Sequence, residues 1–141
     1  MEPQELIKIL KDQHKELQED LSLALSKTKS GENPGERIII DLASFKSMLL
    51  SHVQIETEVF YADYLKKEEL KGEKIEDTVK FIKEMDNIAT EIMAFLDEYA
   101  TAKAIDKNLK SFSVELSGII AILNMRIESE EDGVFNLYLA M

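Results

Sequence analysis

Residues 36–67 read ERIIIDLASFKSMLLSHVQIETEVFYADYLKK. Apolar side chains recur in this stretch at alternating steps of three and four, which is the period that places them on one face of an α-helix. Two polar residues fall in the same stripe. Its members are Ile38, Leu42, Phe45, Leu49, His52, Glu56 and Val59. The stretch therefore predicts a long amphipathic helix whose buried face carries an imidazole and a carboxylate.

Three other segments show the same periodicity. The helix-breaking residues Ser-Gly-Glu-Asn-Pro-Gly at 30–35 end a first helix that begins near Pro3, and a weaker break at 70–73 follows the second. Residues 103–106 can separate a third helix from a fourth. The pattern predicts helices over about 3–27, 36–67, 75–100 and 106–139. Four long amphipathic helices with short connections favour an all-α, antiparallel up-down-up-down four-helix bundle, formed as a single domain by residues 1–141.

Composition limits the kinds of protein that the chain can be. Of its 141 residues, 45% are hydrophobic and 32% are charged, as in an ordinary globular domain. No apolar run approaches the roughly 20 residues that cross a bilayer, and the N-terminus lacks the features of a signal peptide. We therefore expect a cytoplasmic protein with no membrane partner.

Charge and cysteine content limit its ligands. The formal net charge of −11 would repel a phosphate backbone, so nucleic acid is not an expected partner. The chain has no cysteine, which excludes a thiolate site. Any metal must be held by nitrogen and oxygen atoms, and the carboxylates of interest are those that interrupt apolar stripes.

Polar residues interrupt the apolar stripes of three helices. His14 lies in the stripe of the first helix, and the second helix contributes His52 and Glu56. The stripe of the fourth helix runs through Arg126 and Glu130 before it reaches Leu137. In an antiparallel bundle these five polar residues lie at similar depths, because a helix rises roughly 1.5 Å per residue. The sequence thus predicts that two imidazoles, two carboxylates and a guanidinium share one layer of the core.

Buried charges are costly unless they are paired, hydrogen-bonded or bound to a metal, and two arrangements meet this need. In the first, His14, His52 and Glu56 form a set of two histidines and one carboxylate that suits iron, manganese or zinc. In the second, Arg126 neutralises Glu56 and Glu130 directly, without a metal. The residues alone leave both arrangements open.

In three segments the sequence resembles the hemerythrin-like, or HHE cation-binding, family of four-helix bundles. These are Asp-Gln-His-Lys-Glu-Leu around His14, His-Val-Gln-Ile-Glu-Thr-Glu-Val-Phe from His52, and Glu-Glu-Asp-Gly-Val-Phe from Glu130. The resemblance covers nearly the whole chain. It implies a non-haem di-iron centre, with five histidines and two bridging carboxylates, that binds dioxygen or senses oxygen, nitric oxide or iron.

The sequence departs from the family pattern at one of the two metal positions. Phe81 and Met85 stand where the family usually has two histidines, and Arg126 replaces a third. The resemblance implies that the other metal could be held by His14, His52, Glu56 and Glu130, with Glu131 as the alternative to Glu130.

We therefore expect no di-iron centre and at most one metal, iron first, with Arg126 as the ion-pair partner in place of the second. The role expected is sensing or binding. The alternative is a metal-free interaction or regulatory module. No catalytic residue is predicted, because no acid–base pair outside the cluster can be recognised, and we expect no enzyme.

Overall fold

The computed structural model describes all residues, 1–141, and is helical throughout, without a strand. Two of its segments, η1 and η2, are π-helical turns built into longer helices. The elements are α1 Pro3–Lys27, α2 Gly35–Ile55, η1 Glu56–Tyr61, α3 Ala62–Leu70, α4 Glu76–Glu98, α5 Ala102–Lys107, α6 Leu109–Ser129, η2 Glu130–Val134 and α7 Phe135–Leu139. The all-α prediction is confirmed.

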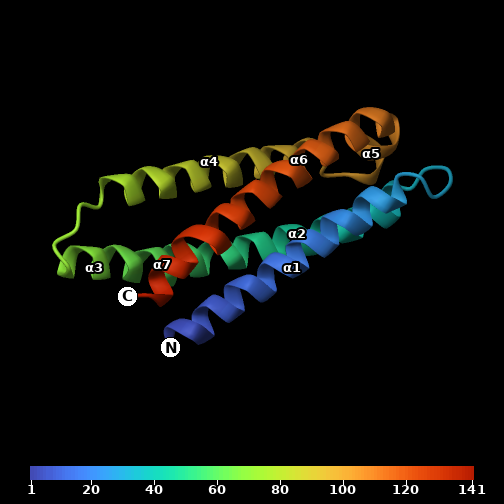
Figure 1. Cartoon of the computed structure of the whole chain (residues 1–141). Helices are drawn as coiled ribbons and strands as arrows, with labels where there is room; N and C mark the ends of the chain where they lie inside the picture. Colours follow the sequence, from blue (N-terminus) through green and yellow to red (C-terminus); the bar gives the residue numbers. More distant parts are fainter.

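The long helices lie side by side as a bundle (Figure 1). Helix α1 packs against α2 and α6, and α4 packs against α6 and α2. Both chain termini lie at the end of the bundle where α3 and α7 are found (Figure 1). This arrangement brings the first half of α1, the end of α2 and the end of α6 to one level.

The break expected at residues 103–106 is wrong, because these residues belong to the short helix α5. The Thr101 side chain accepts a hydrogen bond from the backbone N–H of Ala104 and so caps the start of α5. The chain leaves helical geometry on both sides of α5, at residues 99–101 and at Asn108. The capping threonine was the signal that the sequence interpretation missed.

The two π-helical turns shift the face that each helix buries. Val59 and Leu137 were expected to be buried, but they are 43% and 57% exposed. Phe60 and Tyr138 are buried instead. A π-turn closes its hydrogen bonds over five residues, so the residues beyond it fall out of the steps of three and four that precede it.

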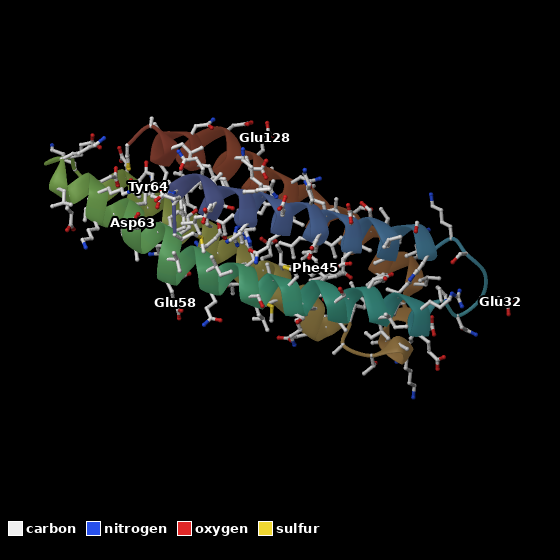
Figure 2. All side chains as sticks on the ribbon, turned by 90° about the horizontal axis from the view of Figure 1, so that it is seen from below. Glu32, Phe45, Glu58, Asp63, Tyr64 and Glu128 are labelled. Carbon is white, nitrogen blue, oxygen red and sulfur yellow. The ribbon has the colours of Figure 1, made fainter.

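The polar layer divides the apolar core in two. A larger cluster lies toward the α5 end and includes Leu17, Phe45 and Leu123, whereas a smaller one toward the chain termini includes Leu10 and Tyr64. Figure 2 labels one residue of each cluster, Phe45 and Tyr64, at separate places along the bundle. The predicted polar residues occupy the level between these clusters, so they are shielded on both sides.

One continuous helical stretch, Gly35–Leu70, is long and apolar enough to cross a membrane, judged by length and composition alone. Its most apolar part is 33% buried. Charged residues such as Asp41 and Lys46 interrupt the stretch, so it is not the continuous apolar run whose absence the sequence predicted. The inward face of the stretch supplies core residues such as Ile38 and Leu49, which accounts for much of its apolar character.

Candidate metal centre

The structure brings together all five polar residues that the sequence placed in one layer. His14 comes from the middle of α1, and His52 lies near the end of α2. Glu56 and Glu130 are the first residues of the two π-helical turns, and Arg126 lies one turn before Glu130. All five are 4% exposed or less.

The nitrogen and oxygen atoms of the four candidate ligands face one another at metal-ligand spacing. The Nε2 atoms of His14 and His52 are 3.1 Å apart. Nε2 of His52 is 3.0 Å from Oε1 of Glu56, and Nε2 of His14 is 3.3 Å from Oε1 of Glu130. All four ligand atoms lie within 4.8 Å of one another. Neighbouring ligands of an ion with bonds of about 2.1 Å are separated by roughly 3.0–3.4 Å, so this group could hold one metal.

Arg126 is paired with both carboxylates of the cluster. Its Nη2 lies 2.6 Å from Oε1 of Glu56, and its Nε lies 3.7 Å from Oε1 of Glu130. Its Nη1 donates to the backbone oxygen of Met85 at 3.3 Å. Phe81 packs against the smaller apolar cluster, and Met85 is buried. The guanidinium of Arg126 therefore supplies the positive charge next to Glu56 and Glu130.

Two carboxylate oxygens in the cluster lack a hydrogen-bond donor. Oε2 of Glu56 and Oε1 of Glu130 are both buried, and neither accepts a hydrogen bond. His14 and Arg126 lie near Oε1 of Glu130 without hydrogen-bonding geometry. A buried carboxylate oxygen without a donor is costly. A cation bound between these oxygens and the two Nε2 atoms would remove that cost, so the donor set fits a metal ion.

Burial and neighbouring charges set the protonation of the cluster. Burial alone would lower the pKa of His14, but the carboxylates around it, Glu130 first, raise it above its ordinary value. Burial and then the positive charge of His14 lower the pKa of His52 to about 3. Burial and then the charge of Glu56 raise the pKa of Glu130 to about 7. Without a metal, the cluster thus keeps a proton between His14 and Glu130, while His52 is neutral.

Contacts to the outer nitrogens of the two imidazoles complete the site, one from Glu131, which the sequence named as the alternative to Glu130, and one from Gln13, which it did not name. Nδ1 of His14 is 2.7 Å from Oε2 of Glu131, so Glu131 contacts the outer side of the imidazole while Glu130 occupies the inner position. Nδ1 of His52 is 2.7 Å from Oε1 of Gln13. The sequence interpretation missed Gln13, which carried no signal beyond its place next to His14.

Each π-helical turn joins a cluster carboxylate to an aromatic ring five residues later. Tyr61, five residues after Glu56, donates its hydroxyl hydrogen to Oε2 of Glu130 at 2.6 Å. Phe135, five residues after Glu130, stacks on His14 with ring centroids 5.7 Å apart. Single π-turns inside α-helices often occur at functional sites. The step of five from a buried carboxylate to an aromatic residue was the available signal for both contacts.

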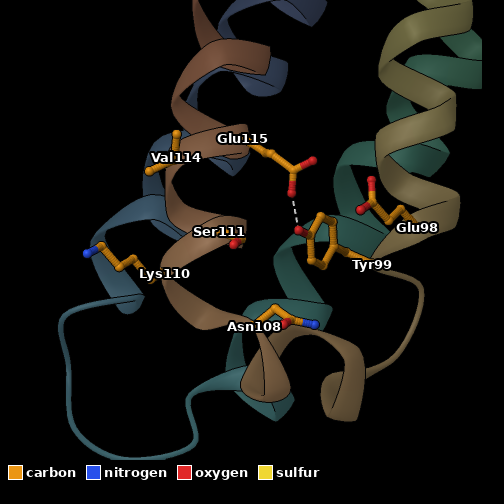
Figure 3. A pocket seen from close by; sticks show the side chains of 7 residues that line it. All are labelled: Glu98, Tyr99, Asn108, Lys110, Ser111, Val114 and Glu115. Carbon is orange, nitrogen blue, oxygen red and sulfur yellow. Dashed lines mark hydrogen bonds between the residues drawn. The ribbon is translucent and has the colours of Figure 1, made fainter.

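A surface depression at the start of α6 is lined by none of the cluster residues (Figure 3). That depression has a volume of about 620 Å³ and is lined by Glu98, Tyr99, Asn108, Lys110, Ser111, Val114 and Glu115. The Tyr99 hydroxyl donates to Glu115 there. Lys110 precedes Arg126 by 16 residues, or roughly 24 Å of helix. The depression is thus a separate feature of the surface.

Comparison with known proteins agrees with this geometry. No curated protein and no solved structure matches the chain. The family model described as the hemerythrin HHE cation-binding domain matches residues 5–138, a range that contains every member of the cluster. The resemblance seen in the sequence is confirmed, and the chain belongs to the hemerythrin HHE cation-binding domain family.

Proposed function

We propose that this chain is a single-metal hemerythrin-like domain that binds one iron ion in a sensing or binding role. His14, His52, Glu56 and Glu130 would hold the ion. Arg126 would replace the second cation of the family's di-metal centre. The bundle would have the antiparallel four-helix arrangement of the family and would retain one of its two metal positions.

One observation carries the proposal: two imidazole Nε2 atoms 3.1 Å apart share a buried space with two carboxylate oxygens that have no hydrogen-bond donor. The fixed charges of the layer are two carboxylates and one guanidinium, which leaves a deficit of positive charge. A divalent ion bound by two nitrogen and two oxygen atoms would supply the missing positive charge. This donor set suits iron(II), manganese(II) or zinc(II). The family match favours iron among them.

The residues around the proposed ion support binding more than catalysis. A bound iron would supply an open coordination position for a small ligand. Phe135 covers one face of His14, and Tyr61 holds Glu130. These rings limit the access of water and of larger molecules to the cluster. The site therefore suits a metal ion or a very small ligand.

A metal-free regulatory module is the second candidate, and one contact favours it. Arg126 already pairs with Glu56 at 2.6 Å in the described structure. The proton held between His14 and Glu130 would then complete the charge balance. In this case the bundle would use its outer faces alone.

Unfolding with and without iron(II), under anaerobic conditions, separates the two candidates. A single-metal domain should gain about 2.7 kcal/mol of unfolding free energy when free iron(II) is one hundred times its dissociation constant. Glu128→Gln, which changes an exposed carboxylate outside the cluster, should gain as much as the parent. No gain, together with no metal in protein purified without chelator, would support the metal-free module instead.

Metal affinity should rise with pH. Binding requires Nε2 of His14 without a proton and Glu130 ionised, and the pKa of each group is raised, that of Glu130 to about 7. Below these pKa values the metal must displace a proton, and above them it need not. Below these pKa values, metal affinity should rise roughly tenfold per pH unit for each displaced proton. Chelator competition at pH 6, 7 and 8 measures it, and an affinity independent of pH would show that the metal binds elsewhere.

A further inference from the structure

The outer nitrogens of both histidines point at oxygen acceptors. Nδ1 of His14 lies 2.7 Å from a carboxylate oxygen of Glu131, and Nδ1 of His52 lies 2.7 Å from the amide oxygen of Gln13. Neither oxygen can donate a hydrogen, so each Nδ1 must carry one. A neutral imidazole has a single N–H. When both rings are neutral, each Nε2 therefore presents a lone pair to the interior of the cluster.

These hydrogen bonds link three elements of the bundle. Gln13 and His14 are consecutive in α1, and they point in different directions because successive helical residues are turned by about 100°. Gln13 reaches His52 in α2, while His14 is held by Glu131 in η2. The residues next to His14 and Glu130 thus each contact a histidine on another helix. The orientation of both rings depends on this chain of contacts.

We propose that Gln13 and Glu131 are positioning residues that fix both histidines as Nδ1–H tautomers, with their Nε2 atoms aimed at one metal position. Neither residue would touch the metal. Hydrogen bonds of this kind orient ligating imidazoles and raise their basicity. Glu131 supplies a negative charge to His14, whereas Gln13 supplies a neutral acceptor to His52. The role in metal binding rests on the proposed function, but the tautomers do not.

Nitrogen-15 NMR of the metal-free protein tests the tautomers directly. His52 should carry its proton on Nδ1 in the parent. Gln13→Leu removes the acceptor and should lose this signature, whereas Gln13→Glu keeps an acceptor and should retain it. The matched control is Gln18→Leu, because Gln18 lies on the same helix and bonds to Asn124 instead. His52 protonated on Nε2 in the parent, or unchanged by Gln13→Leu, would overturn the assignment.

Metal titration of the same variants tests the consequence for binding. Gln13→Leu and Glu131→Leu should each weaken metal binding roughly 10- to 100-fold. Gln18→Leu and Glu128→Leu should bind as the parent does. Gln13 is half-buried and the Glu131 side chain is 30% exposed, so these changes leave the core intact. Losses no larger than those of the controls would overturn the positioning role. A parent that binds no metal would refute the proposed function, while the NMR result would still decide the tautomers.

Discussion

Replacement of His52 by alanine is expected to abolish metal binding. His52 supplies one of only two nitrogen ligands, and its Nε2 lies within 3.1 Å of both His14 Nε2 and Glu56 Oε1. The remaining imidazole and two carboxylates form a weaker set, of which Glu56 is already paired with Arg126. Metal content after purification without chelator, followed by titration of the metal-free variant, measures the loss.

Met85→Ala is the matched control for this change. Met85 is buried, and its hydrogen bond from Arg126 is accepted by its backbone oxygen, which the change to alanine retains. Truncation of a buried methionine costs about 2–5 kcal/mol of stability without removing a metal ligand. Met85→Ala should therefore keep its metal while it is folded. Unchanged metal content in His52→Ala would show that the ion binds outside the cluster.

Replacement of Arg126 by alanine should cost about 3–5 kcal/mol of unfolding free energy above pH 7, as expected when one partner of a buried ion pair is removed. Glu56 and Glu130 would then face each other with a single cation, His14, to offset them. Chemical denaturation at pH 8 measures the loss. The control is Lys46→Ala, which breaks an exposed ion pair with Asp97 at 4.0 Å and should cost at most about 1 kcal/mol.

Acidification should narrow the difference between Arg126→Ala and the parent. The pKa of Glu130 is already raised to about 7 with Arg126 present, and removal of the guanidinium raises it further. As the pH falls toward 7, Glu130 becomes protonated in the variant before it does in the parent, so its repulsion of Glu56 is relieved first in the variant. An added divalent metal should narrow the difference as well. A variant as stable as the parent at pH 8 would refute the charge-replacement account.

Periodicity was sufficient to predict the helices and the level of the cluster. Steps of three and four defined the stripes that contain His14, His52 and Arg126, and the constant rise of a helix fixed their depths. Steps of three and four could not predict the π-helical turns at Glu56 and Glu130, because a π-turn departs from that period. The exposure of Val59 and Leu137 follows from those turns.

The members of the inner cluster were predictable because charged side chains stand out on an apolar stripe. The hydrogen-bond partners of the outer histidine nitrogens were not predictable from the sequence. Gln13 lies on a mostly polar helix face, where nothing in the sequence distinguishes it from its neighbours. Glu131 could be named only as an alternative ligand, since two consecutive glutamates compete for one position. In the structure the π-turn begins at Glu130, and it is the side chain of Glu130 that faces the interior of the cluster.

The central claim is that one metal position remains and that Arg126 fills the other. The most direct test is anaerobic reconstitution of the metal-free protein with excess iron(II), followed by removal of unbound iron, exposure to air, and measurement of iron per chain and of the near-ultraviolet absorption spectrum. We predict one iron per chain and no charge-transfer bands of an oxygen-bridged pair. Two irons per chain with those bands, or no bound iron at all, would contradict the account.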